Sequence, residues 1–112
     1  MGKMSRDKGK TGERELAKIL RSYGFEARRG VQYKGGSDSP DVVGLDGIHI
    51  EVKRCERLEL WKAIMQSCCD SAPNEIPAVF HRKNRMPWVV ILPLDGFMKL
   101  YKKGAENEQA TL

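Results

Sequence analysis

Hydrophobic residues recur at helical spacing in three stretches of the chain. The spacing predicts a helix over residues 11–23, ended by Gly24, and a second over residues 57–72, ended by Pro73. A shorter amphipathic pattern predicts a third helix over residues 94–104. In the second helix, one apolar stripe is formed by Trp61, Ile64, Met65, Cys68 and Ala72.

Five stretches with the pattern of β-strands lie between these helices. They cover residues 25–31, 41–45, 48–55, 76–83 and 88–94. The dipeptide Asp46-Gly47, which suits a two-residue hairpin turn, joins the second stretch to the third. The order helix, three strands, helix, two strands, helix predicts an α/β fold in which helices flank a mixed central β-sheet.

The length of 112 residues allows one domain with a single hydrophobic core. We expect a basic N-terminal arm over residues 1–10, a folded domain over residues 11–103 and a polar tail over residues 104–112. The net charge of +5 is concentrated in the arm, at Lys53-Arg54 and in residues 81–85. It is typical of a protein that binds a polyanion, although ordinary solubilising charge explains it equally well.

The sequence offers no sign of a membrane or secreted protein. No apolar run reaches membrane-spanning length, and the N-terminus lacks the apolar core of a signal peptide. Cys55, Cys68 and Cys69 form no paired Cys-x-x-Cys motif, so we expect reduced and mostly buried thiols. These features favour an intracellular, cytoplasmic protein.

The predicted strand over residues 48–55 has one apolar and one polar face. Side chains alternate along a strand. One face therefore carries Ile48, Ile50 and Val52, and the other carries His49, Glu51 and Lys53. A strand with one face in solvent shows the same alternation, so Glu51 and Lys53 alone do not indicate a function.

The hairpin brings a second acid to the polar face, because a tight turn puts Asp41 beside Glu51. Neighbouring carboxylates repel each other, a divalent cation removes the repulsion, and hard oxygen ligands favour magnesium or manganese over zinc. Lys53 points to the same place, where it can orient a water or neutralise charge on a phosphate. Glu13 of the first helix can also reach inward, although its place near a helix start equally suits the helix dipole. The backbone carbonyl of Val52 is expected as a further metal ligand.

The motifs "KGKTGERELAKILRSYGFEARR", "SDSPDVV" and "IEVKR" together resemble the PD-(D/E)xK nuclease superfamily. The resemblance covers residues 8–100 and is greatest to the archaeal-type Holliday junction resolvases and their phage-borne relatives. It implies a restriction-endonuclease-like fold, a homodimer, and a Mg²⁺- or Mn²⁺-dependent endonuclease that leaves a 5′-phosphate and a 3′-hydroxyl. It also implies that the acidic ligands are Glu13, Asp41 and Glu51 and that the catalytic lysine is Lys53.

Other polar residues have two interpretations each. Gln66 of the second helix is either a further active-site residue, as in related nucleases, or a solvated one. His49 either lines the site or is a polar residue near a strand end, and Trp61 and Trp88 are expected as core or dimer anchors. The loop over residues 34–39 either wraps a phosphate or only connects strands. The expected DNA contacts are Lys8, Lys10, Arg14, Lys34, Ser37, Ser39, Arg54, Arg82, Lys83 and Arg85.

These observations favour a structure-selective DNA endonuclease of the junction-resolving type. A nuclease acting on flaps, nicks or damaged duplex, and an inactive nucleic-acid-binding module, are the alternatives. The complete set of Glu13, Asp41, Glu51 and Lys53 argues against an inactive module, because folding alone requires none of the four. Selectivity for branched DNA depends on how a dimer arranges two active sites, which the sequence does not reveal.

Overall fold

The computed structural model describes the backbone of residues 2–30 and 40–111 and the side chains of residues 9–30 and 40–108. Within these residues, eight elements follow one another in the predicted order of helices and strands. They are α1 (Gly2–Ser22), β1 (Arg28–Arg29), β2 (Val42–Val43), β3 (Ile48–Arg54), α2 (Leu60–Asp70), β4 (Ile76–Arg82), β5 (Val89–Ile91) and α3 (Leu94–Thr111).

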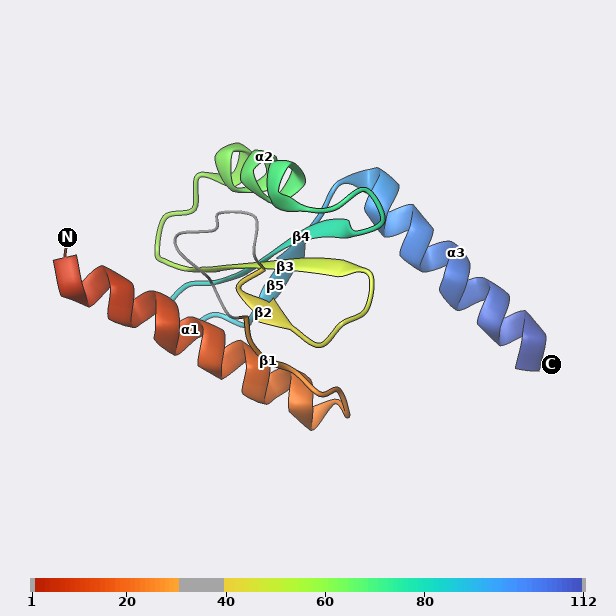
Figure 1. The fold of residues 1–112 in the computed structure, drawn as a ribbon, viewed down its shortest axis with the longest axis horizontal. Coiled ribbons are helices and arrows are strands. Elements are labelled where there is room, and N and C mark those ends of the chain that lie inside the picture. The colour runs from red at the N-terminus through yellow and green to blue at the C-terminus, as the bar shows by residue number, and fades with distance from the viewer. Residues whose placement is uncertain (1, 31–39, 112) are drawn as a thin grey trace.

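The strands form one five-stranded sheet in the order β1-β2-β3-β4-β5. Strands β3 and β4 are parallel, and the other neighbours are antiparallel. The parallel pair requires a crossover, which α2 provides. Helix α1 lies on one side of the sheet and α2 on the other, while α3 extends away from it (Figure 1). The predicted α/β fold with a mixed central sheet is confirmed.

Both terminal helices are longer than the hydrophobic pattern predicted. Helix α1 begins at Gly2 rather than at residue 11, and α3 continues to Thr111 rather than to residue 104. Residues 2–10 of the expected arm and 104–111 of the expected tail are therefore helical. Their Lys, Arg, Glu and Gln residues have high helix propensity but no apolar period, so a search for periodic apolar residues misses them. None of the helices described here has the length and apolarity needed to cross a membrane.

The hydrophobic core lies between α1 and the sheet. Leu16 and Ala17 of α1 are 2% exposed and pack with residues whose side chains share one face of the sheet. These residues are Val42, Ile50, Val52, Ala78 and Phe80. Ile50 and Val52 are the apolar positions that strand alternation predicted, so the opposite face of β3 is left for polar side chains.

Helix α2 buries a different face from the one expected. Its buried residues are Ala63 and Ser67, whereas Trp61 and Met65 of the apolar stripe are 73% and 61% exposed. The small side chains let α2 approach the polar face of the sheet, and the stripe then faces solvent. Cys68 and Cys69 are exposed and Cys55 is half-buried, so the expectation of mostly buried thiols was wrong.

Candidate active site

The turn between β2 and β3 is closed by a backbone hydrogen bond. The N–H of Ile48 donates to the carbonyl of Leu45 at 3.1 Å, which places Asp46 and Gly47 at the centre of the turn, as predicted. Gly47 has a φ of 81°, a conformation that glycine adopts at little cost. This turn returns the chain from β2 towards β3.

The register of the two strands differs from that of a simple hairpin. Val42 pairs with Ile50, so β2 uses one residue more than β3 between this pair and the turn. The extra residue coincides with Gly44, which has a φ of 128°. A shift of one residue moves a side chain to the other face of a sheet. The extra residue therefore puts Asp41, and not its neighbour, on the same face as Glu51.

Gly44 also lies against the segment before β1. A Cβ at this position would be 2.5 Å from the Cα of Ala27 and 2.9 Å from its backbone nitrogen. Both the backbone angle and the close approach require glycine here. The local register that brings two acids together thus depends on a residue with no side chain.

Asp41 and Glu51 form a buried pair of carboxyl groups, 9% and 5% exposed. Asp41 Oδ2 accepts a hydrogen bond of 2.8 Å from the N–H of Val52, and the two carboxyl groups also hydrogen-bond to each other. Burial and the charge of Asp41 raise the pKa of Glu51 to about 7. Burial also raises the pKa of Asp41. The pair therefore holds a proton near neutral pH.

Lys53 and Gln66 lie next to this pair. Lys53 Nζ donates to Gln66 Oε1 at 3.2 Å, and Gln66 Nε2 approaches Glu51 Oε2 at 3.4 Å. The amide of Gln66 thus bridges the lysine and the carboxyl group. The structure places Gln66 beside the predicted site, with its side chain still exposed to solvent, so an active-site role for Gln66 stays a prediction.

Glu13 approaches the pair from α1. Its neighbour Gly12 lies against β3, where an added Cβ would be 2.6 Å from the Cβ of Arg54, so glycine lets this turn of α1 come close. Glu13 Oε1 accepts a hydrogen bond of 2.9 Å from Arg29 Nε. Burial raises the pKa of Glu13, the nearby charge of Asp41 raises it further, and Arg29 opposes both effects. Glu13 is therefore within electrostatic range of Asp41 but is itself paired with Arg29.

His49, the second residue of β3, lies beside Glu51 and is fully buried. Its Nε2 is 3.6 Å from Glu51 Oε1, and its Nδ1 is 3.6 Å from Glu75 Oε1. Neither ring nitrogen has a hydrogen-bond partner among the described residues, nor has Glu51 Oε1. Sequence reasoning did not predict the roles of Glu75 or of Asp70, whose charge contributes to the raised pKa of Glu51. The signal for Asp70 was its position one helical turn after Gln66.

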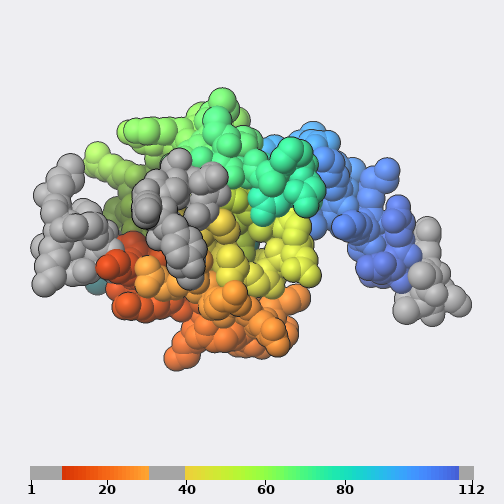
Figure 2. Space-filling model, viewed as in Figure 1, coloured from red at the N-terminus to blue at the C-terminus, as the bar shows by residue number. Residues whose placement is uncertain are grey.

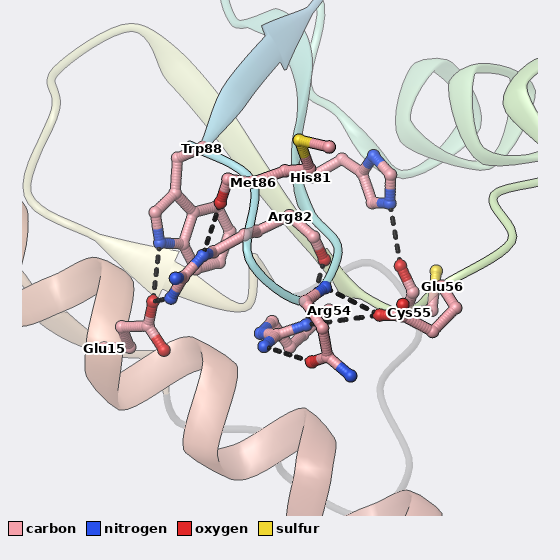
Figure 3. A network of polar contacts seen from close by, with 9 residues as sticks. Glu15, Arg54, Cys55, Glu56, His81, Arg82, Met86 and Trp88 are labelled. Carbon is pink, nitrogen blue, oxygen red and sulfur yellow. Dashed lines mark hydrogen bonds and ion pairs between the residues drawn. The ribbon is translucent and has the colours of Figure 1, made fainter.

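Two of the expected DNA-binding residues are engaged elsewhere (Figure 3). Arg54 donates to Asn84 Oδ1 at 2.8 Å. Arg82 is ion-paired with Glu15 of α1, and Trp88 Nε1 donates to the same carboxylate at 2.9 Å. Arg54 and Arg82 are register partners on the α1 face of the sheet, so this network joins α1 to the sheet on the face opposite Lys53.

The other expected DNA contacts divide into two groups. Exposed positions are occupied by Lys10, Arg14, Lys83 and Arg85. Outside the described side chains lie Lys8, Lys34, Ser37 and Ser39, and the loop over residues 34–39 with them. The structure therefore leaves the phosphate-binding interpretation of that loop as a prediction.

In residues 9–30 and 40–108, no group of three acidic, histidine or cysteine side chains is arranged to hold a metal ion. The Asp41–Glu51 pair nevertheless offers two hard oxygen donors side by side, including the buried Glu51 Oε1. Magnesium is often bound by one or two carboxylates, with waters and substrate phosphates completing its shell. The chemistry of the pair therefore fits this cation.

Comparison with known protein families agrees with the fold. The sequence model of the family described as "Archaeal holliday junction resolvase (hjc)" matches residues 4–95. Neither the comparison with curated proteins nor that with solved structures gave a match. The five-stranded mixed sheet with helices on both faces is consistent with the restriction-endonuclease-like fold of that family. The chain therefore belongs to the archaeal Holliday junction resolvase family, a PD-(D/E)xK nuclease family, and at family level it is a Holliday junction resolvase-like nuclease.

Proposed function

We propose that this protein is a magnesium- or manganese-dependent endonuclease that cuts phosphodiester bonds in four-way DNA junctions. The observation that carries the proposal is the buried pair of Asp41 and Glu51, whose carboxyl groups share a hydrogen bond and whose pKa values are both raised. Two buried acids without a cation are unfavourable for folding, so such a pair points to a functional role. The family match supplies the substrate class.

Asp41 and Glu51 would hold the cation, and the backbone carbonyl of Val52 and the carboxylate of Glu13 are further ligands in this proposal. When bound, the cation supplies an activated water and neutralises charge on the phosphoryl oxygens. The pair must first lose its shared proton, because a metal ligand is a deprotonated carboxylate. Glu13 would act either directly or through a water, while its Oε1 accepts a hydrogen bond from Arg29.

Lys53 would contact the scissile phosphate or the attacking water from the same face of β3. Its ammonium group lies on the polar face with Glu51, and Gln66 accepts a hydrogen bond from it. A lysine held beside the reacting phosphate stabilises negative charge that develops in the transition state. Gln66 is proposed to set the position of Lys53 relative to Glu51, since its amide contacts both.

The DNA-binding surface in this proposal includes four exposed cations. Lys10, Arg14, Lys83 and Arg85 remain in the set, with Lys8, Lys34, Ser37 and Ser39 as predictions from the sequence. We leave Arg54 and Arg82 out, because their guanidinium groups are engaged in the network with Asn84 and Glu15. Contacts to phosphates make affinity strongly dependent on salt.

A homodimer is also part of the proposal. Helix α3 extends from the rest of the molecule (Figures 1 and 2), and its Phe97 and Leu100 are 49% and 42% exposed. Together with Phe25, Val90 and Leu92, they line an apolar groove of about 510 Å³. Contiguous exposed apolar surface is typical of a protein–protein interface. A second copy covering this surface would supply the second active site that a two-stranded cut requires.

The dimer is tested by light scattering on the wild type and on Leu100→Asp. The wild type is expected to have twice the mass of one chain, and Leu100→Asp the mass of one. A wild type that stays monomeric at micromolar concentration, with and without DNA, would contradict the dimer. Glu108→Gln, an exposed change on the same helix, serves as the control.

The activity is tested by cleavage of labelled four-way junction, flap, nicked and linear duplex DNA, with magnesium, with manganese and with chelator. The junction is expected to be cut fastest, and only with a divalent cation. Faster cutting of flaps or nicks would favour the alternative repair-type nuclease. Binding without cutting of any substrate would favour a DNA-binding module that lacks activity.

A further inference from the structure

A small hollow adjoins the proposed active site at the connection between β3 and α2. It has a volume of about 220 Å³ and shares two lining residues with the site, Lys53 and Gln66. Gln66, which lines the hollow, also approaches Glu51, so the hollow is next to the carboxyl pair. A substrate group bound there would be a neighbour of the group bound at Glu51.

The charges around the hollow are mostly positive. Arg57 and Lys62 line it in addition to Lys53, and one carboxylate, that of Glu59, opposes these three cations. Glu59 is ion-paired with Lys62 at 3.8 Å, and both side chains are strongly exposed, so water weakens this pair. Among the residues described, Arg57 has no hydrogen-bond or ion-pair partner. The hollow is therefore suited to an anion, and Arg57 is available to bind it.

We infer that this hollow, with Arg57 as its main ligand and Lys62 as a second, binds the DNA backbone phosphate next to the scissile one. The inference rests on the proposed function, since a DNA strand carries one phosphate per nucleotide and the scissile phosphate lies at Glu51 and Lys53 in that proposal. The planar guanidinium of Arg57 can contact two oxygens of one phosphate. Neither Arg57 nor Lys62 was among the DNA contacts expected from the sequence.

A bound neighbouring phosphate would position the scissile bond. It would hold the strand so that the scissile phosphate meets the carboxyl pair and Lys53, rather than only adding affinity. Loss of Arg57 should therefore lower both junction affinity and the rate of cutting, without changing the binding of the cation alone. A residue with a merely structural role would not show this combination.

The first test compares Arg57→Ala and Lys62→Ala with the wild type. Affinity for a four-way junction is measured by fluorescence anisotropy with chelator, and cleavage is measured with magnesium. Arg57→Ala is expected to lose about 10-fold in affinity, the effect of one hydrogen-bonded charge pair, and Lys62→Ala about 3-fold. Lys18→Ala removes an exposed cation from α1 and serves as the control. It should change neither the junction affinity nor the cleavage rate by more than about 2-fold. Calorimetry with magnesium alone should give the same affinity for all four proteins.

The second test identifies the phosphate. After the cut has been mapped, each phosphate flanking it is replaced in turn by an uncharged methylphosphonate. At one of the two positions, the replacement should lower the junction affinity of the wild type about 10-fold. It should lower the affinity of Arg57→Ala by less than about 2-fold, because the interaction is already absent in that variant. If the two losses multiply at both positions, the hollow does not bind a flanking phosphate.

The outcomes separate this inference from the proposed function. If the wild type cuts the junction and Arg57→Ala binds and cuts it equally well, the inference is overturned and the proposed function is left intact. A wild type that neither binds nor cuts junction DNA would overturn both. Thermal melting of each variant checks that the folded state is retained, which is expected because Arg57 and Lys62 are exposed.

Discussion

Asp41 Oδ2 accepts a hydrogen bond of 2.8 Å from the backbone N–H of Val52, the residue between Glu51 and Lys53. A backbone donor on β3 thus orients the acid that β2 contributes. The bond stabilises the ionised form of Asp41, while burial acts in the opposite direction. The position of Asp41 in the site is therefore fixed by a main-chain group of β3.

The first prediction uses this hydrogen bond. Asp41→Asn keeps an oxygen that can accept from Val52 but removes the charge, so the fold and junction affinity should persist while cleavage falls at least about 100-fold. Asp41→Ala should lose cleavage as well, and should also lose about 1–3 kcal/mol of unfolding free energy because a buried N–H is left unpaired. Urea denaturation and junction cleavage measure the two effects. Equal stability of Asp41→Ala and the wild type would contradict the role of the bond.

The second prediction concerns stability and pH. The pKa of Glu51 is about 7 in the folded protein, above its ordinary value of 4.5, so the folded state keeps this proton to higher pH than the unfolded state. The resulting stabilisation is complete below pH 4.5 and is lost as pH rises through 7. Between pH 5 and pH 8, the free energy of unfolding of Glu51→Gln should therefore exceed that of the wild type by about 1–3 kcal/mol. Denaturation curves measured at several pH values test this. If the free energy of unfolding of the wild type and of Glu51→Gln depends on pH in the same way, the prediction is wrong.

The third prediction concerns metal binding. Because Glu51 is partly protonated at pH 6.5, binding of magnesium should release a proton, and affinity should fall as pH drops below about 7. Calorimetry in two buffers of different ionisation enthalpy measures the protons released. Glu51→Gln, which has no such proton, provides the control and should bind magnesium weakly. Identical binding heats in both buffers would show that no proton is released.

The fourth prediction separates the catalytic lysine from the metal ligands. Lys53→Ala should lower cleavage about 100-fold or more and leave magnesium affinity within about 3-fold of the wild type. Gln66→Ala should have a smaller effect on cleavage, about 10-fold, since it acts through Lys53 and Glu51. Single-turnover cleavage and calorimetry give the two quantities. A loss of metal affinity in Lys53→Ala as large as in Glu51→Gln would contradict the assignment.

The fifth prediction tests the hairpin register. Gly44→Ala should lose at least about 2 kcal/mol of unfolding free energy, because its Cβ would meet the backbone of Ala27 and its φ of 128° is unfavourable for alanine. Gly47→Ala has a positive φ but open space around it, so about 1 kcal/mol is expected. The difference between the two isolates the close contact. Reduced cleavage by folded Gly44→Ala would follow if Asp41 is displaced from Glu51.

The sequence by itself determined the order of the elements and the chemistry of β3. Alternation along a strand is a property of the local backbone, so Glu51 and Lys53 could be assigned to one face and Ile50 and Val52 to the other before any fold was known. The turn at Asp46-Gly47 was equally local. Helix positions such as Gln66 followed from the helical period, although the period did not say which face would be buried.

Only the tertiary structure decided which distant groups meet. The extra residue at Gly44 puts Asp41 on the face of Glu51. The requirement for glycine at this position is apparent only from its close contact with Ala27. The pairing of Glu13 with Arg29, and of Arg82 with Glu15, joins residues whose separation in sequence carries no signal. Local backbone geometry repeats with a fixed period that a sequence displays, whereas contacts between elements depend on how whole helices and strands pack against one another.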